Sequence, residues 1–145
     1  MTTQTDFPAI HHNQQLIETY FKAVWNEGDL DSLDNLLTAD YRNHSASIPN
    51  PQPGPAGLKP IVAAMRHAFP DLQYTIQDLI VTPNNVVARV VMSGTQTGDF
   101  FGIPPTNRTV EVAQINIERI RDGKIAEHWR LTDELALMRQ LGLIS

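Results

Sequence analysis

The sequence of 145 residues contains no cysteine, which excludes disulfides, thiolate metal sites and cysteine nucleophiles. Basic residues are few, with 11 Lys and Arg against 16 Asp and Glu, and they form no cluster. Nucleic acids and anionic membranes are therefore not expected as partners, because both bind clustered positive charge. No apolar run is long enough to span a membrane, and the N-terminus lacks the features of a signal peptide, so we expect a cytoplasmic protein.

Several common catalytic motifs are missing as well. The chain has no GxGxxG, P-loop, HExxH or GxSxG pattern, so nucleotide-binding and metalloprotease functions lose their usual signatures. The five histidines show neither HxH nor HxxxH spacing, and we predict no metal site and no cofactor.

The hydrophobic periodicity predicts one α+β domain over residues 1–145, with a polar and disordered tail at 1–9. Helical spacing begins at Ile10 and stops at Gly28, a short helix follows the potential cap Asp29, and a third helix covers 58–69. The second half alternates with a period of two. Helices followed by strands indicate helices packed on one face of a curved antiparallel sheet. The predicted strands are 72–82, 85–96, 109–121 and 124–133, before a closing helix at 134–141.

The last two strands are joined by Asp122-Gly123, a strong signal for a two-residue hairpin turn. This turn places Arg121 opposite Lys124, and the pairing continues along both strands. One face should then line an apolar cavity with a few polar groups, namely Asp133 opposite Val112, Leu131 opposite Gln114 and Trp129 opposite Asn116. The other face should pack on a second subunit or serve structure, and it carries Ala113, Ile115, Ile117, Ala126, His128, Arg130 and Thr132. A shift of one residue would exchange the two faces.

Asp133 has two interpretations. It immediately precedes the helical pattern ELALMRQLG, and aspartate is a favoured helix N-cap, so the local pattern alone favours a capping role. Alternatively, at the mouth of an apolar cavity, the carboxylate acts as a general base that removes an acidic C–H proton. Both roles are compatible with one position at a helix start.

Several stretches together resemble the SnoaL-like polyketide cyclases, a group that includes ester cyclases. The stretches are WNEGDLDSLDNLLTADYRNH (25–44), AFPDLQYTIQDLIV (68–81), GDFFGIPPTNRTVEV (98–112) and DGKIAEHWRLTDELALMRQLG (122–142). The resemblance implies the nuclear transport factor 2-like fold, a cone of helices and curved sheet around a pocket, in a homodimer or higher homo-oligomer. Asn107 departs from the GIPPTGR form that is usual in the family.

The resemblance also implies a chemistry. In characterised members an aspartate after the EHW element is the acid/base of an intramolecular aldol ring closure that uses no metal or organic cofactor, and Asp133 matches it. His44 stands where a histidine is common in the family, so it is either a polar catalytic assistant or a histidine satisfied by backbone. The expected ligand is a small apolar carbonyl compound.

Further pocket candidates lie on other elements. Phe100 and Ile103 are apolar for a loop, so they either cap the pocket or tuck under the sheet edge, while Met65 and Phe69 are pocket roof or core. Two other classes of function remain open. An isomerase, dehydratase or epoxide hydrolase would use similar carboxylates, and a binding or oligomerisation module would keep the cone without the chemistry.

Overall fold

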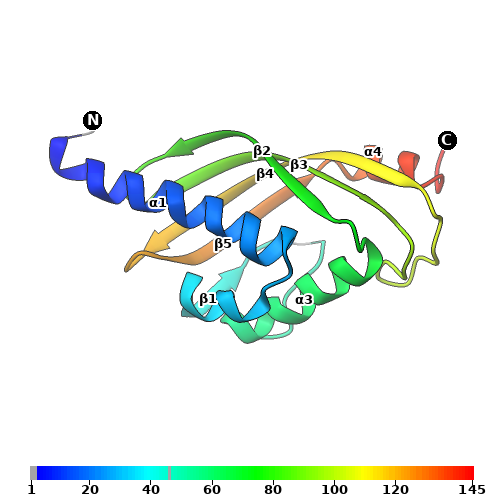
Figure 1. The fold of residues 1–145 in the computed structure, drawn as a ribbon, viewed down its shortest axis with the longest axis horizontal. Helices are drawn as coiled ribbons and strands as arrows, with labels where there is room; N and C mark the ends of the chain where they lie inside the picture. The colour runs from blue at the N-terminus through cyan, green and yellow to red at the C-terminus, as the bar shows by residue number, and fades with distance from the viewer. Residues whose placement is uncertain (1–2, 46) are drawn as a thin grey trace.

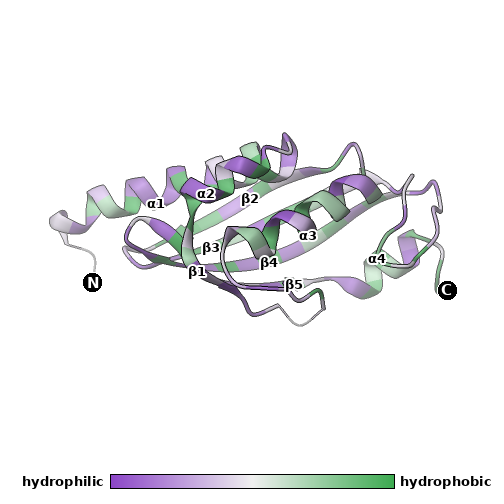
Figure 2. Cartoon of the chain, turned by 90° about the horizontal axis from the view of Figure 1, so that it is seen from below, coloured by the Kyte–Doolittle hydropathy of each residue, from purple (hydrophilic) through white to green (hydrophobic). Residues whose placement is uncertain are grey.

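The structure is a computed structural model that describes residues 3–45 and 47–145. A five-stranded sheet with strand order β1-β5-β4-β3-β2 is covered on one face by helices (Figures 1 and 2). This arrangement confirms the predicted α+β class. One detail differs from the expected antiparallel sheet, because β1 pairs in parallel with β5 and makes the sheet mixed.

The N-terminal helix crosses the sheet along its length (Figure 1). It consists of a 3-10 turn η1 (Gln4–Asp6), α1 (Phe7–Thr19) and a wider π-helical segment η2 (Tyr20–Asn26). Gly28, with φ of 75°, follows its end as predicted. The tail expected at 1–9 is helical from Gln4 onward, because Pro8 suits the first turn of a helix; residues 1 and 2 lie outside the described chain.

The segment after Gly28 folds as a short helix, a strand and a longer helix. Asp29 accepts a hydrogen bond from the Ser32 amide and begins η3 (Leu30–Ser32), which continues as α2 (Leu33–Leu36). Strand β1 (Leu37–Asn43) leads to the proline-rich loop, and α3 (Pro55–Ala68) then packs beside α2. Pro60 lies in the second turn of α3, inside the helix, where it cannot donate the backbone hydrogen bond to the carbonyl four residues earlier.

The four long strands lie within two residues of their predicted bounds. They are β2 (Gln73–Val81), β3 (Asn85–Thr95), β4 (Thr109–Arg121) and β5 (Lys124–Thr132), and the closing helix is α4 (Glu134–Gln140). Asp122 and Gly123 both have positive φ, 52° and 72°, which is the conformation that a two-residue hairpin turn requires.

The predicted register of β4 and β5 holds only beside the turn. Arg121 pairs with Lys124 and Ile120 with Ile125, but Arg119 pairs with Glu127, so Ala126 is an extra residue in β5. This β-bulge shifts every later pair by one and exchanges the faces of β5. The prediction that Trp129 and Leu131 share a face with Gln114 and Asn116 is therefore wrong. His128, Arg130 and Thr132 lie opposite Glu118, Asn116 and Gln114 instead.

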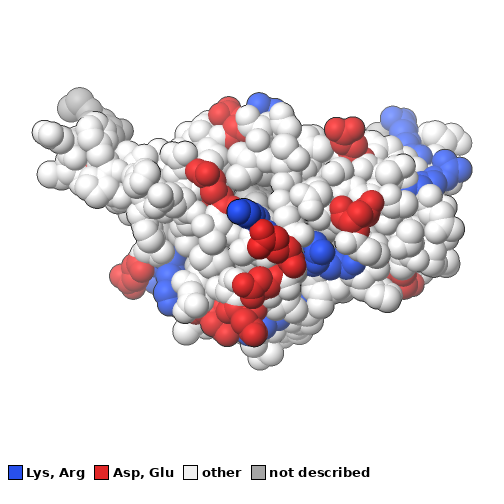
Figure 3. Space-filling view, in the orientation of Figure 1, with Lys and Arg blue, Asp and Glu red and all other residues white. Residues whose placement is uncertain are grey.

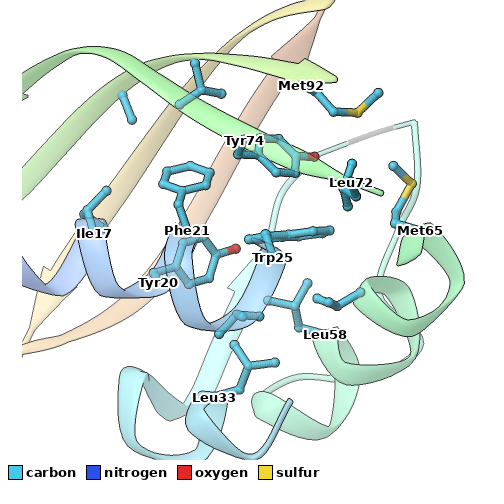
Figure 4. Packing of buried hydrophobic residues seen from close by; sticks show 14 of the residues in the cluster. Ile17, Tyr20, Phe21, Trp25, Leu33, Leu58, Met65, Leu72, Tyr74 and Met92 are labelled. Carbon is cyan, nitrogen blue, oxygen red and sulfur yellow. The ribbon is translucent and has the colours of Figure 1, made fainter. Parts of the chain in front are cut away.

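The core lies between the helices and the covered face of the sheet. Figure 4 shows Phe21 and Trp25 of η2 beside Tyr74 of β2, with Tyr20 next to Phe21. Their rings contact one another at centroid distances of 5.2 to 5.5 Å. Each buried aromatic side chain removes a large apolar area from water, so this cluster fixes η2 against the sheet.

Charged side chains of both signs are interspersed on the face shown in Figure 3. Lys59 of α3, for example, pairs with Asp31 and Asp34 at 3.6 and 3.0 Å. Within residues 3–45 and 47–145, no helix has the length and apolarity needed to cross a membrane.

Candidate active site

A pocket of about 270 Å³ opens between α3, α4 and the covered face of the sheet. Its volume is near the lower end of the roughly 300–1,000 Å³ typical of small-molecule sites. Most of its wall is apolar and comes from the loop after β1, α3, β3, the loop after β3 and α4. These apolar residues are Ile48, Leu58, Ile61, Met65, Met92, Phe100, Phe101, Ile103, Leu137 and Met138.

The polar part of the wall comes mainly from β4 and β5. Three cross-strand pairs face the interior, and we call them the polar ladder: Gln114 with Thr132, Asn116 with Arg130, and Glu118 with His128. Gln114 is 4% exposed, and Asn116 and Glu118 are fully buried. Gln114, His128, Arg130 and Thr132 line the pocket directly. The ladder puts polar chemistry on a sheet face where a core would normally place apolar side chains.

The innermost pair joins a carboxylate to an imidazole. Glu118 Oε1 lies 2.6 Å from His128 Nδ1, and both side chains are at most 2% exposed. A bond to Nδ1 leaves Nε2 as the ring nitrogen available to the pocket, and Nε2 has no partner among the described residues. The carboxylate therefore fixes both the orientation and the tautomer of the ring.

Arg130 supplies a positive charge beside this pair. Its Nε donates to Asn116 Oδ1 at 2.8 Å, and its guanidinium lies 5.1 Å from the ring centroid of Trp25 and 5.9 Å from that of Tyr74. Such aromatic faces stabilise a cation that has few water contacts. Among the described residues the guanidinium forms no ion pair within 4.0 Å. It is thus placed to bind a negatively charged oxygen in the pocket.

Three phenols surround the same interior. Burial raises the pKa of Tyr74 and raises that of Tyr41 well above the ordinary value. Burial, followed by the nearby Glu118 carboxylate, also raises the pKa of Tyr20. These groups stay neutral at physiological pH, so Glu118 and Arg130 are the fixed charges around His128.

Asp133 lies at the start of α4, where its Oδ1 accepts a hydrogen bond from the Ala136 amide at 3.1 Å. The capping role is therefore present in the structure. The residue is exposed, while its neighbours Thr132 and Glu134 both line the pocket. Asp133 thus stands at the pocket rim, and its assignment as acid/base stays a prediction.

His44 lies on the open face of the sheet, away from the pocket wall. Its ring stacks on Trp129 with centroids 4.7 Å apart, and its Nε2 lies 3.1 Å from Glu127 Oε1. Arg119 covers Trp129 at 5.0 Å. Because the bulge turns Trp129 and Leu131 outward, neither lines the pocket, and Leu131 is 77% exposed. The structure does not bring His44 and Asp133 together.

The other predicted pocket residues divide between wall and core. Met65, Phe100, Ile103 and Gln114 line the pocket. Val112 and Phe69 are buried behind the wall, where Phe69 packs edge to face on Phe100 at 5.5 Å. Asn116 reaches the pocket only through its hydrogen bond to Arg130.

The loop that carries Phe100 and Ile103 is held by one buried side chain, Gln96. Its amide nitrogen donates to three carbonyl oxygens, those of Gly98, Ile103 and Pro104, each at 3.1 Å. Its amide oxygen accepts from the backbone and hydroxyl of Thr106 at 3.2 and 2.8 Å. These bonds give a structural reason for the shape of the GDFFGIPPT loop.

Sequence reasoning missed Glu118 altogether and assigned His128 to the wrong face. The available signal was local: Ile125 and Ala126 are adjacent apolar residues that break the alternation of β5, and both are buried. Within the described chain, no three His, Asp or Glu side chains come together as metal donors.

Comparisons with known proteins agree on one family. The family model described as SnoaL-like polyketide cyclase matches residues 15–141. Aklanonic acid methyl ester cyclase DnrD of Streptomyces peucetius is 30% identical over 145 residues, covering 98% of this chain and 92% of that protein. Nogalonic acid methyl ester cyclase of Streptomyces nogalater is 29% identical over 122 residues, covering 83% and 90%.

Solved structures have the same fold. TsrD from Streptomyces laurentii is 36% identical with a TM-score of 0.84, over 92% of this chain and 97% of that one. IdmH from Streptomyces antibioticus, described as a putative polyketide cyclase, is 33% identical with a TM-score of 0.75, over 89% and 97%.

Proposed function

This chain belongs to the SnoaL-like polyketide cyclase family, and on that premise we propose that it is a cofactor-independent cyclase. The proposed substrate is an ester of a polyketide acid, and the reaction is an intramolecular aldol closure of a carbon ring. The observation that carries the proposal is the pocket itself, which has a mostly apolar wall and a polar part formed by Gln114, His128 and Arg130.

The division of the pocket into apolar and polar parts suits such a substrate. Apolar walls exclude water from a fused aromatic skeleton, and a few convergent polar groups fix its carbonyl oxygens. Ring closure requires removal of a C–H proton beside a carbonyl and stabilisation of the resulting enolate. Arg130 would supply that stabilisation, since its guanidinium faces the pocket without a carboxylate partner among the described residues.

The residue that moves the proton is a separate question. The resemblance predicts Asp133, which stands at the rim, with His44 as its assistant. An exposed carboxylate lacks the desolvation that would make it a stronger base. The proposal of a cyclase does not depend on this assignment.

A direct test incubates the purified protein with aklanonic acid methyl ester and nogalonic acid methyl ester, and follows products by chromatography and mass. An aldol closure conserves mass, whereas dehydration removes one water and hydrolysis of the methyl ester replaces its methyl group with hydrogen. Repeating the reaction in D₂O reports C–H exchange, which shows enolate formation even where ring closure is slow.

We expect an isomeric product with at least one of the two esters. Replacing Met65 with Trp should fill the pocket and abolish conversion, while Leu143→Trp, at an exposed position, serves as the matched control. If both esters bind but neither reacts nor exchanges, the chain is a binding module and the cyclase proposal fails.

We also propose that the chain is a homodimer through the open face of the sheet. On that face Ile115 pairs with Leu131 and Ile117 with Trp129 across the two strands. The three aliphatic side chains are 40–77% exposed. Such an apolar patch is unusual on a monomer and typical of an interface.

A further inference from the structure

We propose that His128, held by Glu118, is the acid/base residue of this site, an inference that rests on the proposed cyclase function. His128 would touch the substrate and act as a catalytic residue, and Glu118 would act through it as a positioning residue. The proposal gives a role to the buried pair of the polar ladder, and it assigns the proton transfer to a different residue from the one that the resemblance predicts.

The geometry of the Glu118–His128 pair favours this role. The Glu118 to His128 contact of 2.6 Å involves Nδ1, so the ring presents Nε2 to the pocket that His128 lines. With Glu118 ionised, the proton lies on Nδ1 and Nε2 carries a lone pair. Carboxylate, imidazole and an open reaction space in this order form the arrangement by which hydrolases orient a general base.

The charges around His128 also favour a neutral imidazole in the resting site. Glu118 is fully buried and Arg130 is partly buried, and their opposite charges balance, so a neutral imidazole adds no net charge to this interior. Proton transfer from substrate carbon to Nε2 then creates an imidazolium and an enolate together. The imidazolium lies beside Glu118, and the enolate oxygen lies in the pocket that Arg130 lines. Each new charge therefore has a neighbour of opposite charge.

The pocket wall also holds a hydrogen-bond acceptor that has no protein donor among the described residues. Gln114 Oε1 is buried, belongs to a residue of the pocket wall, and has no hydrogen-bond partner among the described residues. Buried amide oxygens are nearly always paired. A hydroxyl or enol of the substrate would satisfy it, and would place the reacting carbon near the ladder.

The reaction balances without a co-reactant. Nε2 takes the proton of a C–H bond beside the ester carbonyl, and the electron pair of that bond forms the enolate. The enolate carbon attacks a ketone carbon of the same molecule, which forms the new C–C bond and leaves an alkoxide. The imidazolium returns its proton to the alkoxide, which restores neutral His128.

The variants that test this role are His128→Ala and Glu118→Gln, assayed with aklanonic acid methyl ester and nogalonic acid methyl ester. We expect His128→Ala to lower kcat by about 10²-fold or more, as loss of a general acid–base typically does. Added imidazole should restore part of the turnover, because the truncated side chain leaves room for it. A purely structural histidine would not be replaced in this way.

Glu118→Gln keeps an acceptor for Nδ1 and removes only the charge. Without that carboxylate the imidazolium is less favoured, so the rising limb of the kcat–pH profile should move to lower pH. The ionisable groups that share this interior are Glu118, Arg130 and the three phenols, with Glu134 at the pocket wall. The matched controls are Glu111→Gln, on the exposed face of the same strand, and His11→Gln on α1.

The outcomes separate this proposal from the proposed function. If the wild-type protein converts the esters, and His128→Ala folds and converts them within threefold of wild type, the His128 role is refuted and the cyclase function stands. If His128→Ala does not fold, an unchanged pH profile in Glu118→Gln refutes the role instead. If the wild type shows neither conversion nor C–H exchange, both proposals fail together.

Discussion

Substitution of Asp133 separates capping from catalysis, because different replacements keep one role and remove the other. In the structure the carboxylate makes one hydrogen bond, from the Ala136 amide at 3.1 Å, and it is exposed. Replacing an aspartate N-cap by alanine costs about 1 kcal/mol. For a domain of this size that loss lowers Tm by about 3 °C. Asp133→Ser and Asp133→Asn keep a capping oxygen and should unfold within 1 °C or so of wild type.

Turnover is then measured on the same three variants. Because the structure gives Asp133 a capping contact and places His128 in the pocket, we expect Asp133→Ser to keep kcat within about threefold of wild type. Asp29→Ala is the matched control, since Asp29 caps η3 through the Ser32 amide at 3.3 Å and lies on another element. It should lose stability and keep kcat.

One result would refute this reasoning. If Asp133→Ser and Asp133→Asn unfold like wild type but lose about 10²-fold or more in kcat, the carboxylate itself carries the proton. The acid/base role implied by the resemblance would then be correct, and the proposal for His128 would be wrong.

Because burial raises the pKa of all three phenols in the fold, the folded state binds more protons above pH 10. The contribution of the phenols to the free energy of unfolding should be constant below that pH and fall above it. Phenolate absorbance should rise only with unfolding, and a rise in the folded protein would contradict the burial of Tyr20, Tyr41 and Tyr74. Gln96→Leu leaves several loop carbonyls without their donor and should lower the free energy of unfolding, measured by urea denaturation, by about 2–4 kcal/mol. It should also raise KM, because the loop that carries Phe100 loses its support, and an unchanged urea midpoint would show that Gln96 does not hold this loop. The double variant Ile117→Lys with Leu131→Lys should sediment as a monomer where wild type sediments as a dimer, with Leu143→Lys as the exposed control, and a monomeric wild type at micromolar concentration would end the interface proposal.

The elements of this fold were predictable because each has a strong local signal. Gly28 ends the first helix, Asp122-Gly123 makes the last turn, and the period of two marks all four long strands. The parallel pairing of β1 was not predictable in the same way. It depends on contact between residues more than 80 positions apart, such as Asn43 beside His128, and no short-range pattern encodes that contact.

The site was less predictable because its identity depends on one residue of register. A two-residue turn alone would place Trp129 inside and His128 outside, and the apolar character of tryptophan supports that choice. Ala126 reverses it, because a bulge lets the adjacent residues Ile125 and Ala126 both be buried and shifts all later side chains to the other face. The interior then receives an imidazole and a guanidinium in place of an indole and a leucine. Polar side chains are accepted there because β4 offers Glu118 and Asn116 as partners at hydrogen-bond distance. In this molecule the polar residues of β4 and the bulge of β5 depend on each other, and neither strand alone indicates whether His128 or Trp129 faces the pocket.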